Sequence, residues 1–471
     1  MKTLLALIVV VAMPTIALAE GFTLVTTTDY ATGSTSSVDR VAKTSVNDVE
    51  PIHSDAIARF FNPYVYIVNR SGGDNIQVLD PDNNFVTVDQ WSTGNGSNPH
   101  DIYVNSLGTI AYITRYDMTS VLKMDLSTGA TLATISLAAF ADADGIPEMD
   151  RMYQQNNTLY VLLQRLDRNN FYSPVSPSYV AAIDMLTDTV IDLDGGTPGV
   201  QAMPLIRTNP YSEIAGFGSY WPGTGLAFSA VGFFGVNDGG LIAISPANSA
   251  TQSMVLTESA AGGDILDVAA LSPTRGYAIV ANASFETILI EFNPTTGTKT
   301  GATIYNPGGY YLSDIEIGTD LLLADRKPTN PGIRFFDVNT NTQLTANPLD
   351  VGLPPFDIVE QILYCPAGGC PPVAVGDTPR AARLGQNYPN PFNPETSIPF
   401  SLARDGRVTL RVYDVSGHFV ATLLDENRAA GDHVARWDGR DARGRASASG
   451  VYLVRLQARG TTETRKIALL K

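Results

Sequence analysis

The sequence predicts an all-β protein, a β-propeller followed by a small β-sandwich, and three observations lead to this prediction. Segments of similar layout recur between residues 21 and 364, mostly at intervals in the mid-forties. Glycine, proline and tyrosine are abundant, at 41, 29 and 20 of 471 residues, and they punctuate short apolar runs. Near the end of the chain, apolar and polar residues alternate as they do in half-buried strands. A mid-forties period with several short strands per unit is typical of propeller blades.

Each repeat consists of an Asp-led strand, a turn, an aromatic-bearing strand, a polar loop and a strand ending near Asp or Asn. The clearest copies are residues 54–80 and 98–125. Weaker copies are residues 149–184, 223–245, 266–293 and 313–337. The expected second strands are centred on Tyr66, Tyr112, Tyr160, Phe234, Tyr277 and Leu322, at intervals of 46, 48, 74, 43 and 45 residues.

The two ends of the repeat array are expected to pair. Residues 356–359 have the character of a first strand with no blade after it, and residues 22–27 that of a second strand with no first strand before it. Joining them completes a blade and removes exposed sheet edges. The sequence therefore predicts a seven-bladed β-propeller over residues 20–364.

The N-terminus has the pattern of a secretory signal peptide over residues 1–19. A positive start at Lys2 precedes an apolar core from Leu4 to Val11, and Ala17-Leu18-Ala19 is a small-x-small cleavage site. Glu20 follows in place of a cysteine, so we do not expect a lipoprotein anchor. No later apolar run approaches the roughly 18 residues that span a bilayer, so we expect no transmembrane segment after cleavage.

The C-terminal residues 386–471 predict a small Ig-like β-sandwich. Val408, Leu410 and Val412 alternate with polar residues, and a turn at residues 415–418 separates this strand from another at 419–424. Prolines between Pro389 and Pro399 favour an extended segment before them.

Five segments in this region resemble a known sorting signal. They are QNYPNPFNP at residues 386–394, RVTLRVYD at 407–414, WDG at 437–439, SGVYL at 449–453 and RKIALLK at 465–471. In this order they resemble the C-terminal sorting domain of type IX secretion cargo, which shares its Ig-like fold with the flagellar hook-cap family. The resemblance implies export through the periplasm by the type IX secretion machinery, to the outer-membrane surface or the medium. The alternative is a structural Ig-like module without a sorting role, because fold alone does not fix function.

A second resemblance concerns the repeats. YVYIVN at residues 64–69 and IQVLD at 76–80 resemble the YVTN-type propeller repeat of bacterial surface and periplasmic proteins. This resemblance implies the fold and carries no catalytic residues.

Residues 365–385, rich in proline, glycine and alanine, are expected to form a linker. Cys365 and Cys370 bracket four of these residues, and in an oxidising compartment so short a loop can close as a disulfide. A metal site is the alternative, but further ligands have no obvious source nearby.

The formal charge of −16 is unevenly distributed. Residues 385–471 contain 13 basic and 9 acidic residues, so the rest of the chain contains 18 and 38. Such an acidic body argues against nucleic acid as a partner, since phosphate binding needs clustered cations.

Aligning the repeats brings out a set of charged residues. The start of the innermost strand carries an aspartate in six copies: Asp55, Asp101, Asp150, Asp267, Asp314 and Asp357. The end of the second strand, expected on the same face, carries Arg70, Arg115, Arg165 and Arg326. These side chains are expected to ring one mouth of the central channel. They either join blades through backbone N–H groups and arginines, or hold a small molecule, a glycan or a protein there.

Two metal sites are conceivable. His53 and His100 lie near Asp55 and Asp101 and could bind a transition metal, or they are ordinary loop residues. Asp142 and Asp144 resemble part of a calcium loop without the full EF-hand spacing, and otherwise form an acidic turn. No cofactor is certain from the sequence, and calcium is the one it suggests.

No catalytic motif is found, neither H-E-x-x-H, nor G-x-S-x-G, nor a P-loop. Two function classes remain. One is an exported or cell-surface propeller that serves as a binding or scaffold module. The other is an extracellular metal-dependent hydrolase or lyase with its site at the channel mouth.

Overall fold

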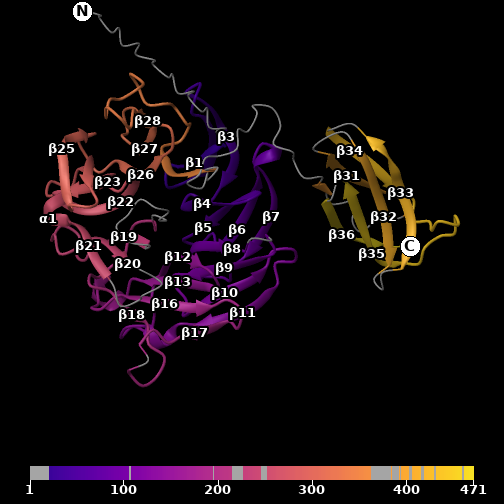
Figure 1. Cartoon of the computed structure of the whole chain (residues 1–471), viewed down its shortest axis with the longest axis horizontal. Helices are drawn as coiled ribbons and strands as arrows, with labels where there is room; N and C mark the ends of the chain where they lie inside the picture. The colour runs from indigo at the N-terminus through magenta and orange to yellow at the C-terminus, as the bar shows by residue number, and fades with distance from the viewer. Residues whose placement is uncertain are drawn as a thin grey trace, which may run out of the picture. The chain divides into compact units, whose positions relative to one another are not determined.

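The structure is a computed structural model of the whole chain (Figure 1). It describes residues 21–361 apart from 106–107, 195, 215–225 and 245–251. It also describes residues 383–470 apart from 385–391, 393, 403–405, 415–417, 429–430 and 459–460. The predicted signal peptide and most of the predicted linker lie outside these residues. The chain divides into two compact units, one being Glu20–Leu363 and the other including Tyr364–Lys471.

The prediction of an all-β protein is confirmed. Among the described residues, helix is limited to α1 (Glu258–Ala261) and three single 3-10 turns, which are η1 (Pro81–Asn83), η2 (Ala138–Phe140) and η3 (Arg168–Asn170). In these residues no helix is long and apolar enough to cross a membrane.

Antiparallel sheets of three to five strands make up the first unit. The sheet that contains both ends of the unit has the order β29 (Pro355–Glu360), β1 (Thr23–Thr28), β2 (Gly33–Asp39), β3 (Thr44–Ile52). The next sheet along the chain consists of β4 (Ala56–Phe61), β5 (Tyr64–Asn69), β6 (Asn75–Asp80) and β7 (Val86–Ser92). The sheet after it consists of β8 (Pro99–Val104), β9 (Ile110–Arg115), β10 (Ser120–Asp125) and β11 (Thr131–Ser136).

The following sheets are less regular. One combines β12 (Met149–Gln155), β13 (Thr158–Leu163), β16 (Tyr179–Asp184), β17 (Thr189–Ile191) and β18 (Met203–Pro204), beside a ribbon of β14 (Leu166–Asp167) and β15 (Ser173–Pro174). The others are β19 (Leu226–Ala230), β20 (Gly240–Ile244), β21 (Gln252–Thr257); β22 (Gly263–Ser272), β23 (Arg275–Asn282), β24 (Thr287–Asn293), β25 (Thr298–Tyr305); and β26 (Leu312–Ile317), β27 (Leu321–Asp325), β28 (Gly332–Phe336).

The expected pairing of the two ends of the array is confirmed. β29 pairs antiparallel with β1, with Asp357 opposite Thr26 and Val359 opposite Leu24. In Figure 1 the indigo start of the unit therefore lies beside its orange end. The buried side of this sheet is supplied by residues more than 300 positions apart in the chain.

Successive sheets contact one another through their innermost strands. β29 contacts β4, β4 contacts β8, and β8 contacts β12; further on, β19 contacts β22, β22 contacts β26, and β26 contacts β29. Figure 1 shows the sheets following one another around a common centre, which is a propeller-like architecture. The hydrophobic core lies between neighbouring sheets: Ile57 and Val68 of one sheet, for example, pack with Ile102 and Ile113 of the next.

The aromatic residues expected on the second strands help to join the sheets. Tyr112 in β9 and Tyr277 in β23 are almost fully buried. The Tyr112 hydroxyl donates to the carbonyl of Met185 at 3.2 Å, and the Tyr277 hydroxyl donates to that of Val338 at 3.1 Å. Each tyrosine thus fills the space between sheets and satisfies its own polar end on a turn of the following sheet.

One of the expected strand positions is wrong. Phe234 lies in the loop between β19 and β20, and not in a strand. The residues after it, Gly235 to Gly240, include several with positive φ, such as Asn237 at 55° and Gly235 at 82°. Such a sequence favours a turn over an extended strand.

The second unit is a two-sheet β-structure. One sheet has the order β30 (Arg383–Leu384), β31 (Thr396–Leu402), β34 (Gly431–Trp437); the other is β33 (Phe419–Arg428), β32 (Gly406–Asp414), β35 (Gly450–Ala458), β36 (Thr461–Leu469). The predicted alternation in β32 is confirmed, because Val408, Leu410 and Val412 are fully buried. Trp437 packs against Phe392 and Tyr452, with ring centroids 5.5 and 5.0 Å apart.

Candidate functional site

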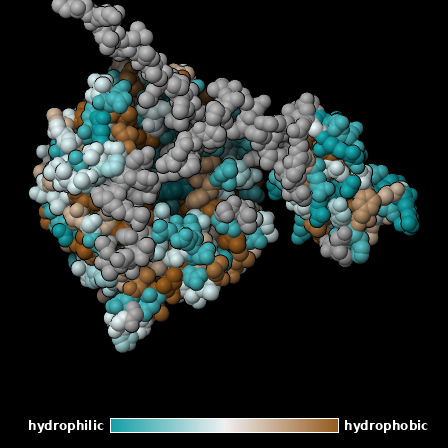
Figure 2. Space-filling model, viewed as in Figure 1, coloured by the Kyte–Doolittle hydropathy of each residue, from teal (hydrophilic) through white to brown (hydrophobic). Residues whose placement is uncertain are grey.

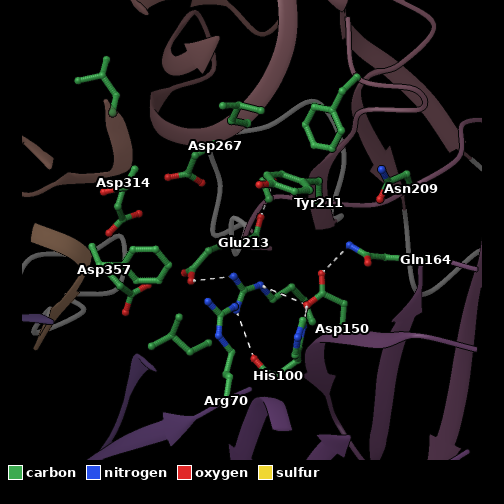
Figure 3. Close-up of a pocket in the computed structure, with 18 of the residues that line it drawn as sticks. Arg70, His100, Asp150, Gln164, Asn209, Tyr211, Glu213, Asp267, Asp314 and Asp357 are labelled. Atoms are coloured by element: carbon green, nitrogen blue, oxygen red, sulfur yellow. Dashed lines mark hydrogen bonds and ion pairs between the residues drawn. The ribbon is translucent and has the colours of Figure 1, made fainter. Parts of the chain in front are cut away.

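A polar cavity of about 420 Å³ opens where the innermost strands of the first unit converge. Figure 2 shows hydrophilic residues in a hollow on this face of the unit, and Figure 3 shows the side chains that line it. Its charged lining residues are Arg70, Asp150, Arg151, Glu213, Asp267, Asp314, Arg326 and Asp357, together with His100. The cavity therefore gathers much of the charge expected at the channel mouth.

Four of the expected aspartates occupy equivalent positions and make the same contact. Each carboxylate accepts a hydrogen bond from a backbone N–H on the innermost strand of the next sheet. The pairs are Asp101 with Met152 at 2.8 Å, Asp267 with Ile315 at 3.2 Å, Asp314 with Ile358 at 2.6 Å, and Asp357 with Ala58 at 2.8 Å. We call these four residues the inter-sheet aspartates. All four are at least nine-tenths buried, so each contact satisfies a donor that water could reach only poorly.

The other two aspartates do not share this position, which corrects the alignment of the repeats. In β8, the residue after Asp101 pairs with Ile113 in the middle of β9. The corresponding pairs are Ala58 with Ile67 and Met152 with Val161, so the matching positions are held by Ile57 and Arg151. Asp55 therefore lies two residues earlier and Asp150 one residue earlier. A register shift next to this position in several sheets hides the offset from a simple sequence alignment.

Asp55 forms an ion pair with Arg70. Arg70 Nε donates to Asp55 Oδ1 at 3.0 Å, and its Nη2 reaches the same oxygen. Burial opposes ionisation of this carboxyl, but the guanidinium outweighs it and lowers the pKa of Asp55 below its ordinary value. Asp55 does not line the cavity itself, whereas Arg70 does.

His100 and Asp150 form a second polar group on the cavity wall. His100 Nδ1 lies 2.9 Å from Asp150 Oδ1, and its ring stacks on Tyr116 at 4.0 Å. Gln164 Nε2 donates to the other Asp150 oxygen at 3.1 Å. Burial lowers the pKa of His100, and the charges of Arg70 and Arg151 lower it further. Burial alone would raise the pKa of Asp150, but His100 and Arg151 outweigh burial, so the pKa of Asp150 is lowered. At neutral pH the pair is thus a neutral imidazole whose Nδ1–H donates to a carboxylate.

A network of charged residues around Arg59 is not predictable from the repeats. Arg59 in β4 contacts Asp101 at 2.9 Å, Glu213 at 2.6 Å and Asp357 at 3.8 Å. Arg151 lies 3.7 Å from the same Glu213 oxygen and 3.9 Å from Asp150. Burial opposes ionisation of Glu213, but the two guanidiniums lower its pKa overall. Arg59 and Glu213 belong to no repeated motif, so only the fold brings them together.

The opposite wall of the cavity carries three carboxyl groups whose pKa values are raised. Burial, followed by the charge of Glu213, raises the pKa of Asp267 to about 7 and that of Asp357 to about 7. Burial and the neighbouring Asp267 raise the pKa of Asp314 well above its ordinary value. In Figure 3 these three carboxyl groups lie on the side away from His100 and Gln164.

The four predicted arginines are not equivalent. Arg70 and Arg326 line the cavity. Arg326 donates to the carbonyls of Pro355 at 2.9 Å and Thr28 at 3.1 Å, and lies over the ring of Tyr30 at 4.6 Å. Arg115 instead donates to Ser120, and Arg165 to the carbonyl of Pro177, so neither is among the lining residues.

Three of the suggested metal ligands accept hydrogen bonds within their own loops. His53 accepts a hydrogen bond from the backbone of Asp55 at 3.1 Å and lies outside the cavity lining. Asp142 accepts from the backbone of Asp144 at 3.0 Å, and Asp144 from that of Ile146 at 2.8 Å, which are contacts of an acidic turn. Among the described residues no cluster of three potential His, Cys, Asp or Glu ligands is found. Cys365 and Cys370 lie outside those residues.

Comparison with known proteins gives one family match. The FlgD Ig-like domain family matches residues 393–462. No relative was found among curated proteins.

Several solved structures are similar to this chain. PorZ, a surface component of the type IX secretion system of Porphyromonas gingivalis, has 13% identity over 93% of this chain and 63% of that chain, with a TM-score of 0.45. This chain thus covers less than two thirds of PorZ. A putative 6-phosphogluconolactonase from Bacteroides uniformis has 16% identity over 73% of this chain and 100% of that chain, with a TM-score of 0.49. Apo AztD from Citrobacter koseri has 11% identity over 73% of this chain and 98% of that chain, with a TM-score of 0.44. With identities of 11–16% and TM-scores below 0.5, these similarities carry no conclusion about the function of this chain.

Proposed function

We propose that this is an exported bacterial protein in which residues 20–364 form a seven-bladed propeller that binds a ligand at its central cavity. Residues 386–471 direct its secretion by the type IX machinery, through the periplasm to the cell surface or the medium. The ligand is a small molecule, a glycan or an exposed part of another protein.

The export proposal is supported at both ends of the chain. The start has the three-part pattern of a signal peptide. The end has segments that resemble a sorting signal, in and around residues 393–462, which match the FlgD Ig-like family. Phe392, Trp437 and Tyr452 come from three of these motifs and pack together in the core. Arg465 and Lys466 of the last motif remain exposed. The buried motif residues therefore support the fold, while Arg465 and Lys466 lie at the surface of the domain.

The seven blades are supported by the number and order of the sheets. In the described part of residues 21–361, seven sheets of three or more strands follow one another along the chain. The pairing of β29 with β1 combines the two ends in one of them. The 74-residue interval between Tyr160 and Phe234 is accommodated by the ribbon of β14 and β15, β18 and the loops around them.

The ligand-binding proposal depends on one observation, the break in symmetry around the cavity. The inter-sheet aspartates repeat a single structural contact, as expected of residues that join sheets. The cavity lining also contains a cluster that the other sheets do not repeat, formed by His100, Asp150, Arg151 and Glu213. His100 Nδ1 lies 2.9 Å from Asp150, and Arg151 lies 3.9 Å from Asp150 and 3.7 Å from Glu213. A repeated fold needs no such cluster, whereas binding sites on repeated folds usually break the repeat.

Secretion tests the export proposal. Deleting residues 386–471 from the full precursor in a bacterium with a type IX system should leave the protein folded in the periplasm. The intact precursor should reach the surface or the medium. Equal export of the two proteins would contradict a sorting role and leave the domain as a structural module.

A second function is favoured by the His100–Asp150 pair. Because Nδ1–H of His100 donates to Asp150, the other ring nitrogen carries a lone pair, and a carboxylate-oriented neutral imidazole can act as a general base. This arrangement fits an extracellular hydrolase or lyase. Turnover of a polysaccharide or ester substrate that is lost in His100→Asn, with the fold retained, would favour this function over simple binding.

A further inference from the structure

Aromatic side chains at the cavity stay exposed although large aromatic residues are usually buried. The cavity is lined by Tyr30, Tyr211, Phe234 and Tyr310, which are 70%, 37%, 46% and 50% exposed. The rings of Tyr211 and Phe234 meet edge to face at 5.3 Å, which leaves ring surface available. Clustered exposed apolar groups beside a polar cavity are a feature of ligand sites. We call these four residues the aromatic rim.

Below the rim, a buried amide lacks part of its hydrogen bonding. Asn209 is 4% exposed, lines the cavity, and donates through Nδ2 to the carbonyl of Gly232 at 3.1 Å. Its Oδ1 has no hydrogen-bond partner in the described part of the chain. An unsatisfied buried acceptor is costly, so this position favours a ligand that brings a donor such as a hydroxyl.

The cavity offers donors and acceptors in close proximity. Arg70 and Arg151 present N–H groups, while Glu213 and Asp150 present carboxylate oxygens. Figure 3 shows Arg70, Asp150 and Glu213 around one space, with Tyr211 above Glu213 and Asn209 near Gln164. A ligand with many hydrogen-bond donors and acceptors on a small surface matches this lining.

Charge narrows the class of ligand further. The guanidiniums that line the cavity already have partners, since Arg70 pairs with Asp55, and Arg151 lies near Asp150 and Glu213. A phosphate, sulfate or uronate group would have to compete with these carboxylates, so such groups are disfavoured. An organic cation is also disfavoured, because Arg59 and Arg151 already neutralise Glu213. The acidic wall of Asp267, Asp314 and Asp357 resists losing its protons in the buried site. A ligand without net charge neither competes with these ion pairs nor requires the buried carboxyl groups to ionise.

Building on the proposed binding function, we infer that the cavity binds a neutral saccharide. The apolar C–H face of a pyranose ring packs on the aromatic rim, and its hydroxyls donate to Asn209 Oδ1 and Glu213 and accept from Arg151. The cavity volume of about 420 Å³ falls in the usual range for ligand pockets of roughly 300–1,000 Å³.

Calorimetric titration of the full-length mature protein tests this inference. The probes are neutral hexasaccharides of β-1,4-glucose, β-1,3-glucose, xylose and mannose, beside matched oligomers of glucosamine and galacturonate, spermidine and short zwitterionic peptides. We expect binding of at least one neutral oligosaccharide. Tyr211→Ala and Phe234→Ala should each weaken it by roughly tenfold.

Phe171→Ala is the matched control, because Phe171 is 96% exposed and is not a lining residue. It should leave binding unchanged, and thermal unfolding should verify that all three variants fold. Equal loss in the control would place the saccharide elsewhere and overturn the inference. Binding of only charged probes at the cavity would overturn the saccharide class and keep the binding function. No binding by any probe would count against both the saccharide class and the binding function. The secretion experiment tests the export proposal independently of these results.

Discussion

The carboxylate of Asp101 in β8 accepts the backbone N–H of Met152 in β12 at 2.8 Å, and its other oxygen accepts from Arg59 Nε of β4 at 2.9 Å. One buried side chain thus connects three sheets. Asp357 makes the equivalent contact with Ala58 and so links the last innermost strand to the first complete sheet. These contacts assign the inter-sheet aspartates to the cohesion of the first unit.

Asp101→Ala is expected to lower the stability of the first unit by about 1–3 kcal/mol, because it leaves the N–H of Met152 without an acceptor in a buried site. Asp101→Asn keeps an oxygen in place and should cost less than Asp101→Ala. Denaturant unfolding measures both. An alanine variant as stable as the parent would mean that the aspartate is not a structural link.

Asp314→Asn is expected to behave differently. The amide oxygen can still accept from Ile358, while the repulsion among Asp267, Asp314 and Asp357 is relieved. Each of these carboxyls has a higher pKa in the folded than in the unfolded chain, so the folded state binds more protons above their ordinary pKa of 3.8, and does so up to about 7 for Asp267 and Asp357. Their contribution to stability is therefore greatest below 3.8 and is lost as the pH rises through the pKa of the folded state.

It follows that the unfolding free energy of Asp314→Asn should increase relative to that of the parent as the pH rises. The comparison is the difference in unfolding free energy between variant and parent at about pH 5 and about pH 8. Taking the difference cancels other titrating groups, such as Glu148, whose pKa burial raises to about 7. A difference that does not change with pH, or that changes in the opposite direction, would show that Asp314 is ionised throughout.

Arg59→Met is expected to be the most destabilising of these changes, at about 3–5 kcal/mol, because it leaves buried carboxylates of Asp101, Glu213 and Asp357 without their shared cation. Arg407→Met, at an exposed pair with Asp425 in the second unit, is the control and should change stability little. Similar small effects in both variants would show that the carboxylates around Arg59 find other partners.

The pKa of His100 should respond in opposite directions to its two charged neighbours. Burial first, and then Arg70 and Arg151, hold it below 6.5, whereas Asp150 raises it. Asp150→Asn should therefore lower the pKa further, and Arg70→Met should raise it. NMR titration of the histidine side chains measures both shifts, with His53→Gln to aid assignment. Shifts of the same sign would mean that the His100–Asp150 pair does not form as described.

Local patterns were enough to predict the strands and their order. The tyrosines at 66, 112, 160 and 277 lie on second strands, and residues 22–27 and 356–359 pair, because alternation and turn residues are local signals. Phe234 was misplaced because an aromatic residue beside glycines fits a strand and a loop equally well in sequence.

The site was predicted only in part. Six aspartates were expected in one position, but Asp150 lies one residue before it, beside a register shift, and Asp55 lies two residues before it, next to a strand that pairs without a shift. Arg59 and Glu213 meet because sheets far apart in the chain face one cavity, and nothing in their own sequence neighbourhoods signals this. The same holds for Asn209, whose unsatisfied oxygen is a property of the folded cavity alone.

Export of a foreign passenger by the C-terminal unit tests the central claim most directly. Residues 383–471 are fused to a periplasm-directed fluorescent protein in a bacterium with a type IX system, and fluorescence is measured in the medium and on protease-accessible cell surfaces. The account predicts that the passenger is exported, and that it stays in the periplasm when the machinery is deleted or when Trp437→Ala disrupts the core of the domain. A passenger that remains in the periplasm with intact machinery and a folded domain would contradict it.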